Sequence, residues 1–479
     1  MSLADYEVVI GLEVHCQLAT RTKMFSACPQ RIGAPPNTMV DAYTLGMPGT
    51  LPVPNAEAVR YGIALALALG CEVQGTSQFV RKHYFYPDLP KGYQITQSDR
   101  PYAWGGGIEI PAGRIRLHHI HFEEDAGKNV HVPGEDVSLV DYNRAGAPLL
   151  EIVGEPDLRS ASDAADYLRE LRAIVRTLGI SEANMEQGTL RCDANVSLRR
   201  RGVETLGTRC EIKNLNSFRF LERAIEAETR RQADLLDAGE AIVMATMSFD
   251  PDRGVTKIMR TKEDAADYRY MPEPDLPLLV LPDGWVASLR EAQPELPAAR
   301  RLRYADLGLS ANSAALLVDD PELAAYFDAT VRSGAEPKTV ANWVGGELLA
   351  KLEGAPICDS PLAPEQLAEL IGMIADGTVS GRAAKQVFST VWAEGGSPRA
   401  IAERDGHRQV SDTSVLEAAV VEVIASSPKQ LAQFRSGKVS LKGYFVGQVM
   451  KKTRGQANPK LVGEILDRQL AATSEALPE

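Results

Sequence analysis

The chain lacks the features that mark membrane and exported proteins. No apolar run among its 479 residues reaches the roughly 18–20 residues that a membrane-spanning helix needs. The first residues show no basic segment followed by an apolar one, which is the pattern of an export signal. We therefore expect a soluble, cytoplasmic protein that does not contact a membrane.

Cysteine is scarce and is not arranged for disulfides. The six cysteines are scattered, with no Cys-x-x-Cys pair. Most of them stand at apolar positions, which favours buried reduced thiols over disulfides. Their positions are Cys16, Cys28, Cys71, Cys192, Cys210 and Cys358.

Several catalytic motifs are also missing. There is no GxxxxGK[ST] phosphate loop and no GxGxxG, because the glycines at 105–107 lack that spacing. There is no GxSxG, and no cysteine has an evident partner histidine. A nucleotide would therefore be held by carboxylates, a metal ion and basic side chains, and any ammonia would come from another protein.

The rest of the composition is ordinary for a globular chain of several domains. Apolar residues make up 44%, charged residues 24%, and the formal net charge is −12. A proline-dense stretch at 270–284 interrupts strands and helices alike, which places a domain edge there. We predict a domain of strands and helices at 1–288, a helical domain at 289–405 and a small helical tail domain at 406–479.

Three helices are predicted in the first domain. Residues 55–70 predict a buried helix with an asparagine cap and a C-terminal glycine. Ser160 or Ser162 caps a second helix, which Gly179 ends, and a third helix begins near Ser217. These helices are expected to be scaffolding for chemistry on the strands.

Three predicted strands carry an unusual polar face. Residues 10–18, 190–198 and 208–214 alternate between apolar and polar side chains with a period of two, and the last two segments predict a hairpin. The polar side chains are Glu13, His15 and Gln17 in the first strand, Arg191, Asp193, Asn195 and Ser197 in the second, and Arg209, Glu211 and Lys213 in the third.

A sheet with one wetted face explains any single strand of this kind. Carboxylates are poor strand formers, however, so their recurrence indicates a role other than solubility. Glu151 stands alone in an apolar strand, which is costly unless it meets a cation or hydrogen-bond donors. Residues 120–128 add Glu123, Glu124, Asp125 and Lys128. If the strands share a sheet, these carboxylates and His15 suit a hard divalent ion such as Mg²⁺, which bridges the phosphates of ATP.

Eight motifs are specific enough to indicate a family. They occupy residues 10–15, 84–95, 123–128, 141–152, 191–197, 211–217 and 267–275, together with 443–459 near the C-terminus. With these motifs in order, the chain resembles the B-subunit family of aspartyl/glutamyl-tRNA amidotransferases over essentially its whole length.

The resemblance implies an α+β fold and a reaction. The first domain is expected to be a cradle with an antiparallel sheet of the glutamine-synthetase kind, followed by an all-helical domain and a helical tail. The implied substrate is tRNA(Gln) misacylated with glutamate or tRNA(Asn) misacylated with aspartate. ATP phosphorylates the side-chain carboxylate, and ammonia then displaces phosphate to leave the amide. A partner amidase, the A subunit, is expected to supply ammonia from glutamine, and a small C subunit to clasp the two.

The resemblance also implies roles for individual residues. The metal candidates are Glu13, His15, Glu124, Asp193 and Glu211, with Glu123 and Glu151 beside them. Catalytic roles fall to Glu124, Lys128, Arg191 and Asp193. The nucleotide and the aminoacyl end are expected to contact Lys82, Tyr84, Tyr86, Asp88, Lys91, Arg209 and Lys213. The alternative for His15 is a hydrogen bond to a metal ligand. Strand periodicity leaves open which of Glu123 and Glu124 points inward, and Glu124 is our expected ligand.

One departure from the family concerns zinc. Many relatives carry a four-cysteine zinc knuckle, and the matching positions here are Ser26, Cys28, Asp41 and Thr44. One thiol cannot make a closed tetrahedral thiolate site. We therefore predict no structural zinc.

The segment 435–460 is basic and has no acidic residue. Its charge alone is typical of a solvated helix face, and the resemblance favours contact with the tRNA body through backbone phosphates. The predicted tRNA-binding residues are Lys438, Lys442, Lys451, Lys452 and Arg454.

Two alternatives to an amidotransferase subunit remain at this point. One is a non-catalytic scaffold that docks tRNA, against which the carboxylate-bearing strands count. The other is a free-standing amino-acid ligase, for which the basic tail has no evident purpose.

Overall fold

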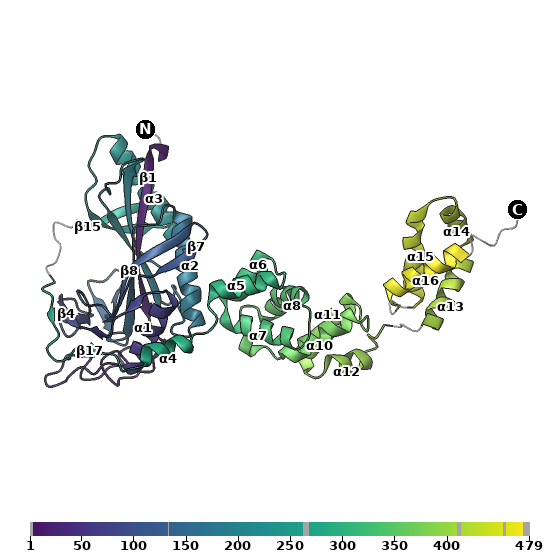
Figure 1. The fold of residues 1–479 in the computed structure, drawn as a ribbon, viewed down its shortest axis with the longest axis horizontal. Coiled ribbons are helices and arrows are strands. Elements are labelled where there is room, and N and C mark those ends of the chain that lie inside the picture. Colours follow the sequence, from purple (N-terminus) through teal and green to yellow (C-terminus); the bar gives the residue numbers. More distant parts are fainter. Residues whose placement is uncertain (1–2, 133, 262–267, 410–412, 454–456, 473–479) are drawn as a thin grey trace. The chain divides into compact units, whose positions relative to one another are not determined.

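The fold is described from a computed structural model that covers residues 3–132, 134–261, 268–409, 413–453 and 457–472. The chain divides into two compact units, residues 1–300 and 301–479. The first unit combines a large sheet with helices, as Figure 1 shows, so the predicted α+β class is confirmed at that level. No helix among the described residues is long and apolar enough to cross a membrane.

A ten-stranded sheet forms the centre of the first unit, in the order β15-β14-β13-β12-β1-β11-β8-β6-β2, with β7 paired to β8 off this path. Its strands are β1 (Tyr6–Gln17), β2 (Glu72–Val73), β6 (Ala103–Trp104), β7 (Gly107–Ile110), β8 (Gly113–Glu124), β11 (Pro148–Gly154), β12 (Leu190–Arg200), β13 (Cys210–Leu215), β14 (Ala245–Asp250) and β15 (Val255–Thr261).

The predicted antiparallel pairing holds through the middle of this sheet, and the predicted β12–β13 hairpin is confirmed. One pair differs, because β13 and β14 run parallel. Smaller sheets pair β9 (Lys128–His131) with β10 (Ser138–Asp141), β4 (Val80–His83) with β5 (Tyr93–Thr96) and β16 (Met271–Pro272), and β3 (Thr76–Ser77) with β17 (Leu279–Val280).

Each long strand separates a buried side from a polar one. In β1, Val14 and Cys16 are fully buried, whereas Glu13 and His15 on the other side are half-buried. This is the period-two alternation expected of a strand that covers a core with one face. The sheet therefore presents its carboxylates and histidines together on the face away from the core.

Helices complete the core of the first unit. They are α1 (Ala56–Ala68), α2 (Ala161–Thr177), α3 (Phe218–Asp237) and α4 (Trp285–Glu291). The predicted caps are confirmed: Asn55, Ser160 and Ser217 each accept a hydrogen bond from a backbone N–H of the first helical turn. Such a cap contributes about 1 kcal/mol. Side chains of α1, α2 and α3 share one hydrophobic cluster with the apolar side of the sheet.

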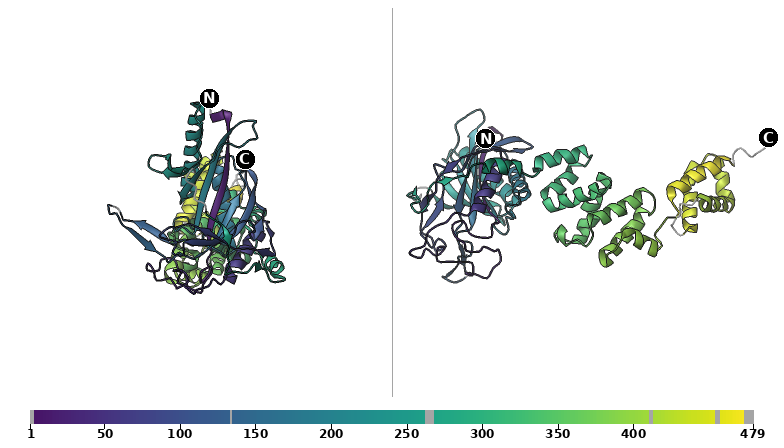
Figure 2. Two further views of the ribbon diagram at one scale, coloured as in Figure 1. Left: turned by 90° about the vertical axis from the view of Figure 1, so that its left-hand side faces the viewer. Right: turned by 60° about the horizontal axis from the view of Figure 1, so that its bottom comes forward.

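The second unit is helical in its described residues, as the green-to-yellow part of the ribbon in Figure 2 shows. Its helices are α6 (Ala311–Asp319), α7 (Pro321–Arg332), α8 (Pro337–Trp343), α9 (Leu349–Leu352), α10 (Pro364–Ala375), α11 (Gly381–Glu394), α12 (Pro398–Arg404), α13 (Thr413–Ala425), α14 (Pro428–Arg435), α15 (Lys442–Lys452) and α16 (Pro459–Ala472); α5 (Pro297–Asp306) crosses the division between the units.

This unit contains two separate hydrophobic clusters. One draws its buried residues from 304–402 and the other from 416–470. Separate cores are consistent with two helical domains, and the three-domain division with its predicted boundaries stays a prediction.

All six cysteines are free thiols, as predicted. Five are buried, as the apolar positions of most of the cysteines predict, and Cys358 is exposed. It lies in a short 3-10 turn, Ile357–Asp359, between two helices.

Candidate active site

The strand register aligns four ionisable side chains in a row across the polar face. His121 on β8 lies opposite Glu151 on β11, Glu151 lies opposite His15 on β1, and His15 lies opposite Arg191 on β12. Directly paired residues of an antiparallel sheet point to the same side, with Cβ atoms about 4.5–5.5 Å apart. Strands that are distant in sequence therefore bring their charges together.

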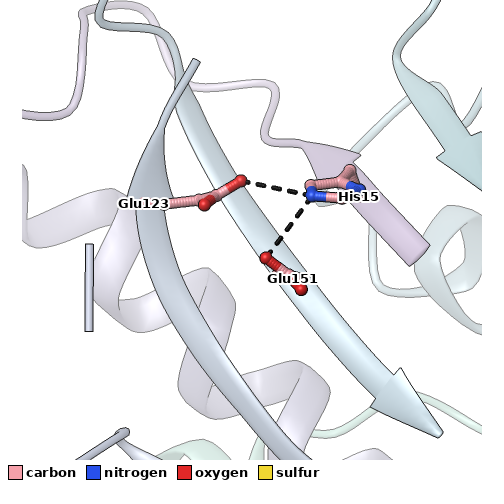
Figure 3. Close-up of side chains that lie close together, drawn as sticks. All are labelled: His15, Glu123 and Glu151. Atoms are coloured by element: carbon pink, nitrogen blue, oxygen red, sulfur yellow. Dashed lines mark ion pairs between the residues drawn. The ribbon is translucent and has the colours of Figure 1, made fainter. Parts of the chain in front are cut away.

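One cluster with the spacing of metal ligands consists of His15, Glu123 and Glu151, drawn in Figure 3. The Nε2 atom of His15 lies 3.5 Å from Glu123 Oε1 and 3.4 Å from Glu151 Oε2. One ligand atom from each residue falls within 4.8 Å of the others. Two carboxylates and an imidazole at this spacing can hold a divalent metal ion.

Charge–charge contacts shift the pKa values of this cluster. Burial alone would lower the pKa of His15, but its hydrogen bond to Glu151 and the charges of Glu151 and Glu123 raise it. Burial opposes charging of His121 as well, yet the same two carboxylates raise its pKa to about 9. Burial would raise the pKa of Glu151, but His121 and His15 hold it well below its usual range. In the structure, His15 and His121 face these carboxylates at the place where a metal ion would bring positive charge.

A second carboxylate cluster lies next to the first on β1, β12 and β13. The Lys213 ammonium is 2.6 Å from Asp193 Oδ2 and 3.0 Å from Glu211 Oε1. Asn195 donates a 2.9 Å hydrogen bond to Glu13 Oε1. Burial, together with the charges of Glu151 and Glu211, raises the pKa of Glu13. Lys213 is shared between Asp193 and Glu211, and Glu13 lies beside them, so this cluster of three carboxylates also favours an added cation.

Glu124 does not join either cluster. Its Oε1 atom accepts hydrogen bonds from Lys91 Nζ and, at 3.0 Å, from the backbone N–H of Ile95. Lys91 also donates to the hydroxyl of Tyr43 at 3.0 Å. The structure thus places Glu123, rather than the expected Glu124, beside His15, and Glu124 is buried in an ion pair. Its role as a metal ligand stays a prediction that this geometry does not favour.

A cavity of about 1120 Å³ opens over the polar face, which is ample for a nucleotide. Eight of the predicted site residues line it: His15, Lys82, Tyr84, Glu123, Lys128, Arg191, Asp193 and Lys213. Eight others do not: Glu13, Tyr86, Asp88, Lys91, Glu124, Glu151, Arg209 and Glu211.

Of the predicted nucleotide contacts, Lys82, Tyr84 and Lys213 line the cavity. The Lys82 ammonium lies 4.9 Å from the centre of the Tyr268 ring, and Tyr84 packs edge-on against Tyr86 and Tyr268. Arg209 is exposed and precedes β13, which begins at Cys210. The carbonyl of Asp88 accepts the backbone N–H of Gly127, so this residue has a visible structural role.

Sequence analysis overlooked a row of histidines and an arginine. His119 Nε2 lies 3.1 Å from His121 Nδ1, and the two rings stack at 5.2 Å. His119 and His121 alternate with Glu123 along β8, so the period-two pattern applied to residues 113–124 would have found them. Arg144, which lines the cavity, lies between β10 and β11, where no periodicity points to it.

The four positions that match the family's zinc knuckle are linked by hydrogen bonds. Asp41 Oδ1 accepts from the backbone N–H of Thr44 at 2.8 Å and from its hydroxyl at 2.7 Å. Ser26 Oγ accepts from the N–H of Cys28 at 3.3 Å. The ammonium of Lys23, a fully buried residue, lies 3.4 Å from Thr44 Oγ1. A lysine and hydrogen bonds therefore tie this loop together.

Of the predicted tRNA-binding lysines, Lys442, Lys451 and Lys452 lie on α15, and Lys438 lies between α14 and α15. Lys442 pairs with Asp467 at 2.6 Å, and Lys452 pairs with Glu422, so their charges are partly offset. Lys438 and Lys451 are exposed. Arg454 lies outside the described residues.

A carboxylate-rich sheet beside a large cavity is typical of a catalytic domain, and comparison with known proteins supplies the family. Residues 8–287 match the GatB/GatE catalytic domain, and residues 325–470 match the GatB domain. The chain belongs to the GatB family.

Individual relatives are similar over their full length, and each is named as the B subunit of an aspartyl/glutamyl-tRNA(Asn/Gln) amidotransferase. The chain is 50% identical over 481 residues to the protein of Anaeromyxobacter sp., covering 98% of this chain and 100% of the relative. It is 51% identical over 476 residues to the protein of Geotalea daltonii, with coverage of 97% and 99%. The corresponding protein of Thermosynechococcus vestitus is 48% identical over 482 residues, with coverage of 97% and 96%.

Proposed function

We propose that the chain is the B subunit of a tRNA-dependent amidotransferase that converts Glu-tRNA(Gln), Asp-tRNA(Asn) or both to the amide. The observation that carries this proposal is the paired register of β8, β11, β1 and β12, which gathers His15, Glu123, Glu151 and Arg191 on one face of the sheet. His15, Glu123 and Arg191 also line the cavity. The match to a catalytic domain favours an enzyme subunit over the scaffold alternative.

The residues present fit a divalent metal ion. Glu123 and Glu151 offer oxygen ligands, and His15 offers one nitrogen within 4.8 Å of them. Mg²⁺ prefers oxygen and keeps several waters, so two carboxylates, one of them at an open cavity, suit it. When bound with ATP, the ion neutralises phosphate charge during transfer. Asp193 and Glu211 would hold a second ion if Lys213 moved aside.

The chain's own residues bind and orient the reactants. Lys82 and Tyr84 border the cavity beside Glu123, where the misacylated end of the tRNA would enter. Arg191 and Lys213 contribute positive charge at the sheet, which favours bound phosphate. In this proposal the sheet relates to the glutamine-synthetase fold, and the helical segments that follow position the tRNA.

Ammonia would come from a partner amidase, the A subunit, and a small C subunit would complete the assembly. The sequence contains no hydrolase motif that would release ammonia from glutamine. The relatives described above are named as B subunits, which supports a complex of several chains.

The test uses the chain co-purified with its partner subunits, ATP, Mg²⁺ and free ammonia. Phosphate release and amidation of Glu-tRNA(Gln) are followed for the wild type, Glu123→Gln and Asp193→Asn. We expect phosphate release that depends on the misacylated tRNA, and its loss in both variants while tRNA binding persists. Normal amidation by both variants would instead leave the chain as a tRNA-docking scaffold.

A further inference from the structure

Asp125 follows β8 directly and is buried between two arginines of the cavity wall. Arg191 NH2 donates a 2.6 Å hydrogen bond to Asp125 Oδ2, and Arg144 Nε lies 3.3 Å from the same oxygen. The side chain of Asp125 is 5% exposed, whereas those of Arg144 and Arg191 are 33% and 35% exposed. One carboxylate therefore holds two guanidinium groups, and a net positive charge remains on this part of the wall.

The Asp125 carboxylate is itself held rigidly. Its Oδ1 atom accepts the backbone N–H of Ala126 at 2.9 Å. Its own backbone N–H donates to the carbonyl of Ala147, and its carbonyl accepts from Gly146, each at 2.8 Å. Arg144 closes the same turn, donating from Nε to the carbonyl of Ala126 at 3.0 Å and from NH2 to that of Gly127 at 2.6 Å.

Arg191 has a donor that nothing satisfies. Among the described residues, its buried Nε–H has no hydrogen-bond acceptor. Buried donors in folded proteins are nearly always paired, so an unpaired one indicates an acceptor that the chain itself does not supply. Arg191 lines the cavity and lies opposite His15 in the register of β1 and β12. The missing acceptor would thus sit beside the carboxylate cluster.

We propose that Arg144 and Arg191, oriented by Asp125, form the subsite for the phosphoryl group that passes from ATP to the side-chain carboxylate of the aminoacyl-tRNA. Guanidinium groups match a phosphoryl oxygen pair in shape and charge. Arg144 and Asp125 carry no role in the function proposed above. This inference rests on that function, and it makes Asp125 a positioning residue that acts through the two arginines.

The subsite serves both chemical steps. In the first, a carboxylate oxygen of the substrate bonds to the γ-phosphorus, the bond to the bridging oxygen breaks, and ADP leaves with the electron pair. In the second, the ammonia nitrogen bonds to the acyl carbon, the carbon–oxygen bond breaks, and phosphate leaves with the proton that nitrogen loses. The phosphoryl oxygens carry negative charge throughout, so fixed guanidinium groups stabilise both steps.

The first test is Asp125→Asn in the assembled complex, which keeps the shape of the side chain and removes its charge. We expect kcat for tRNA-dependent phosphate release to fall about 100-fold, since misplacing one such donor has effects of that order. The KM for ATP and the Kd for tRNA should change less than about threefold, because the nucleotide keeps its other contacts. Asp157→Asn is the matched control: Asp157 binds Arg116 through both carboxylate oxygens, at 2.7 and 2.8 Å, but does not line the cavity.

The second test asks whether Arg191 touches the reacting group. Arg191→Ala is expected to lose phosphate release, and added guanidinium ion is expected to restore part of that activity. The same concentration of guanidinium ion should not raise phosphate release by Asp157→Asn. This test does not depend on the folding of Asp125→Asn, because rescue is measured within one variant. The subsite proposal is wrong if kcat is unchanged in Asp125→Asn or if only the KM for ATP rises. It is also wrong if guanidinium ion does not restore activity to Arg191→Ala.

The two proposals fail in different ways. If the wild-type complex releases no phosphate in response to misacylated tRNA, the proposed function itself is wrong. If the wild type is active and the Asp125 and Arg191 variants behave as the control does, the function stands and the subsite lies elsewhere.

Discussion

Glu13 on β1 and Asp193 on β12 lie directly opposite each other in the strand register, so two carboxylates meet on the polar face. Like charges in that position repel and destabilise a sheet. The ammonium of Lys213, 2.6 Å from Asp193, offsets the repulsion only in part, because Glu211 shares it at 3.0 Å. The protein thus keeps a local electrostatic strain that a bound cation would relieve.

Glu13→Gln is therefore expected to stabilise the metal-free protein. The change removes one charge and keeps an oxygen that can accept from Asn195. We expect the free energy of unfolding of the first unit to rise by about 0.2–1 kcal/mol, and added Mn²⁺ or Mg²⁺ to stabilise the variant less than the wild type. Urea denaturation with and without the ion measures both effects.

Glu7→Gln on the same strand is the control for that prediction. Glu7 pairs with Arg199 at 2.5 Å, so losing its charge should lower stability slightly and leave the response to metal unchanged. A Glu13→Gln variant that is less stable than the wild type in the absence of metal would contradict the proposed strain.

Substitutions of the adjacent Glu123 and Glu124 are expected to have different effects, one on metal binding and the other on stability. Glu123→Gln removes an oxygen beside His15, so metal affinity should fall, with a small effect on folding. Glu124→Gln leaves the Lys91 ammonium, whose side chain is 6% exposed, without its carboxylate. Breaking a buried ion pair in this way lowers stability by about 3–5 kcal/mol.

Isothermal titration with Mn²⁺ and urea denaturation distinguish these two isosteric variants. Loss of metal binding in Glu124→Gln without loss of stability would show that the assignment made from sequence was right and that the Lys91 pair opens when the ion binds.

Much of this architecture could be predicted from the sequence, because it depends on local sequence patterns. Strand alternation placed Glu13 and His15 on one face, and short polar side chains marked the helix starts at Ser160 and Ser217. Those features depend on neighbours a few residues away. The parallel pairing of β13 with β14 does not, because α3 lies between the two strands and only tertiary packing sets their direction.

For a related reason, the sequence could not predict which of Glu123 and Glu124 lies beside His15. In the structure β8 runs to Glu124, so Glu123 shares a face with His119 and His121, but the sequence does not show that the strand reaches this far before the turn. Lys91, which binds Glu124, comes from a loop some thirty residues earlier, and no local pattern links the two. Asp125 and Arg144 likewise meet only because the turn after β8 folds back against the segment before β11.

Gly62→Ala is expected to destabilise the packing of α1 against β8, the strand that carries Glu123. A Cβ atom at residue 62 would lie 2.4 Å from a ring carbon of Phe122, which is fully buried on β8 next to Glu123. Overpacking of this kind costs about 1–3 kcal/mol. Gly372→Ala in α10 is the control, since no atom lies within 4 Å of its added Cβ and alanine favours the helix. Equal stability of the two variants would show that Phe122 moves aside freely.

Lys451→Ala with Lys452→Ala is expected to weaken tRNA binding and its dependence on salt. Both lysines lie in the last turn of α15, where the exposed Lys451 is free to approach a backbone phosphate and Lys452 would exchange Glu422 for one. Each lost phosphate contact lowers the slope of log K against log salt concentration by about 0.7–0.9, so the slope should fall by about one to two units.

Filter binding of tRNA between low and moderate salt measures that slope. The control is Arg382→Ala with Lys385→Ala on α11, which removes two exposed cations outside the basic segment. If both double variants shift the slope equally, the effect reflects net charge alone. If only the α15 variant shifts it, the last helices contact the tRNA backbone, because a general change in charge would act from either position.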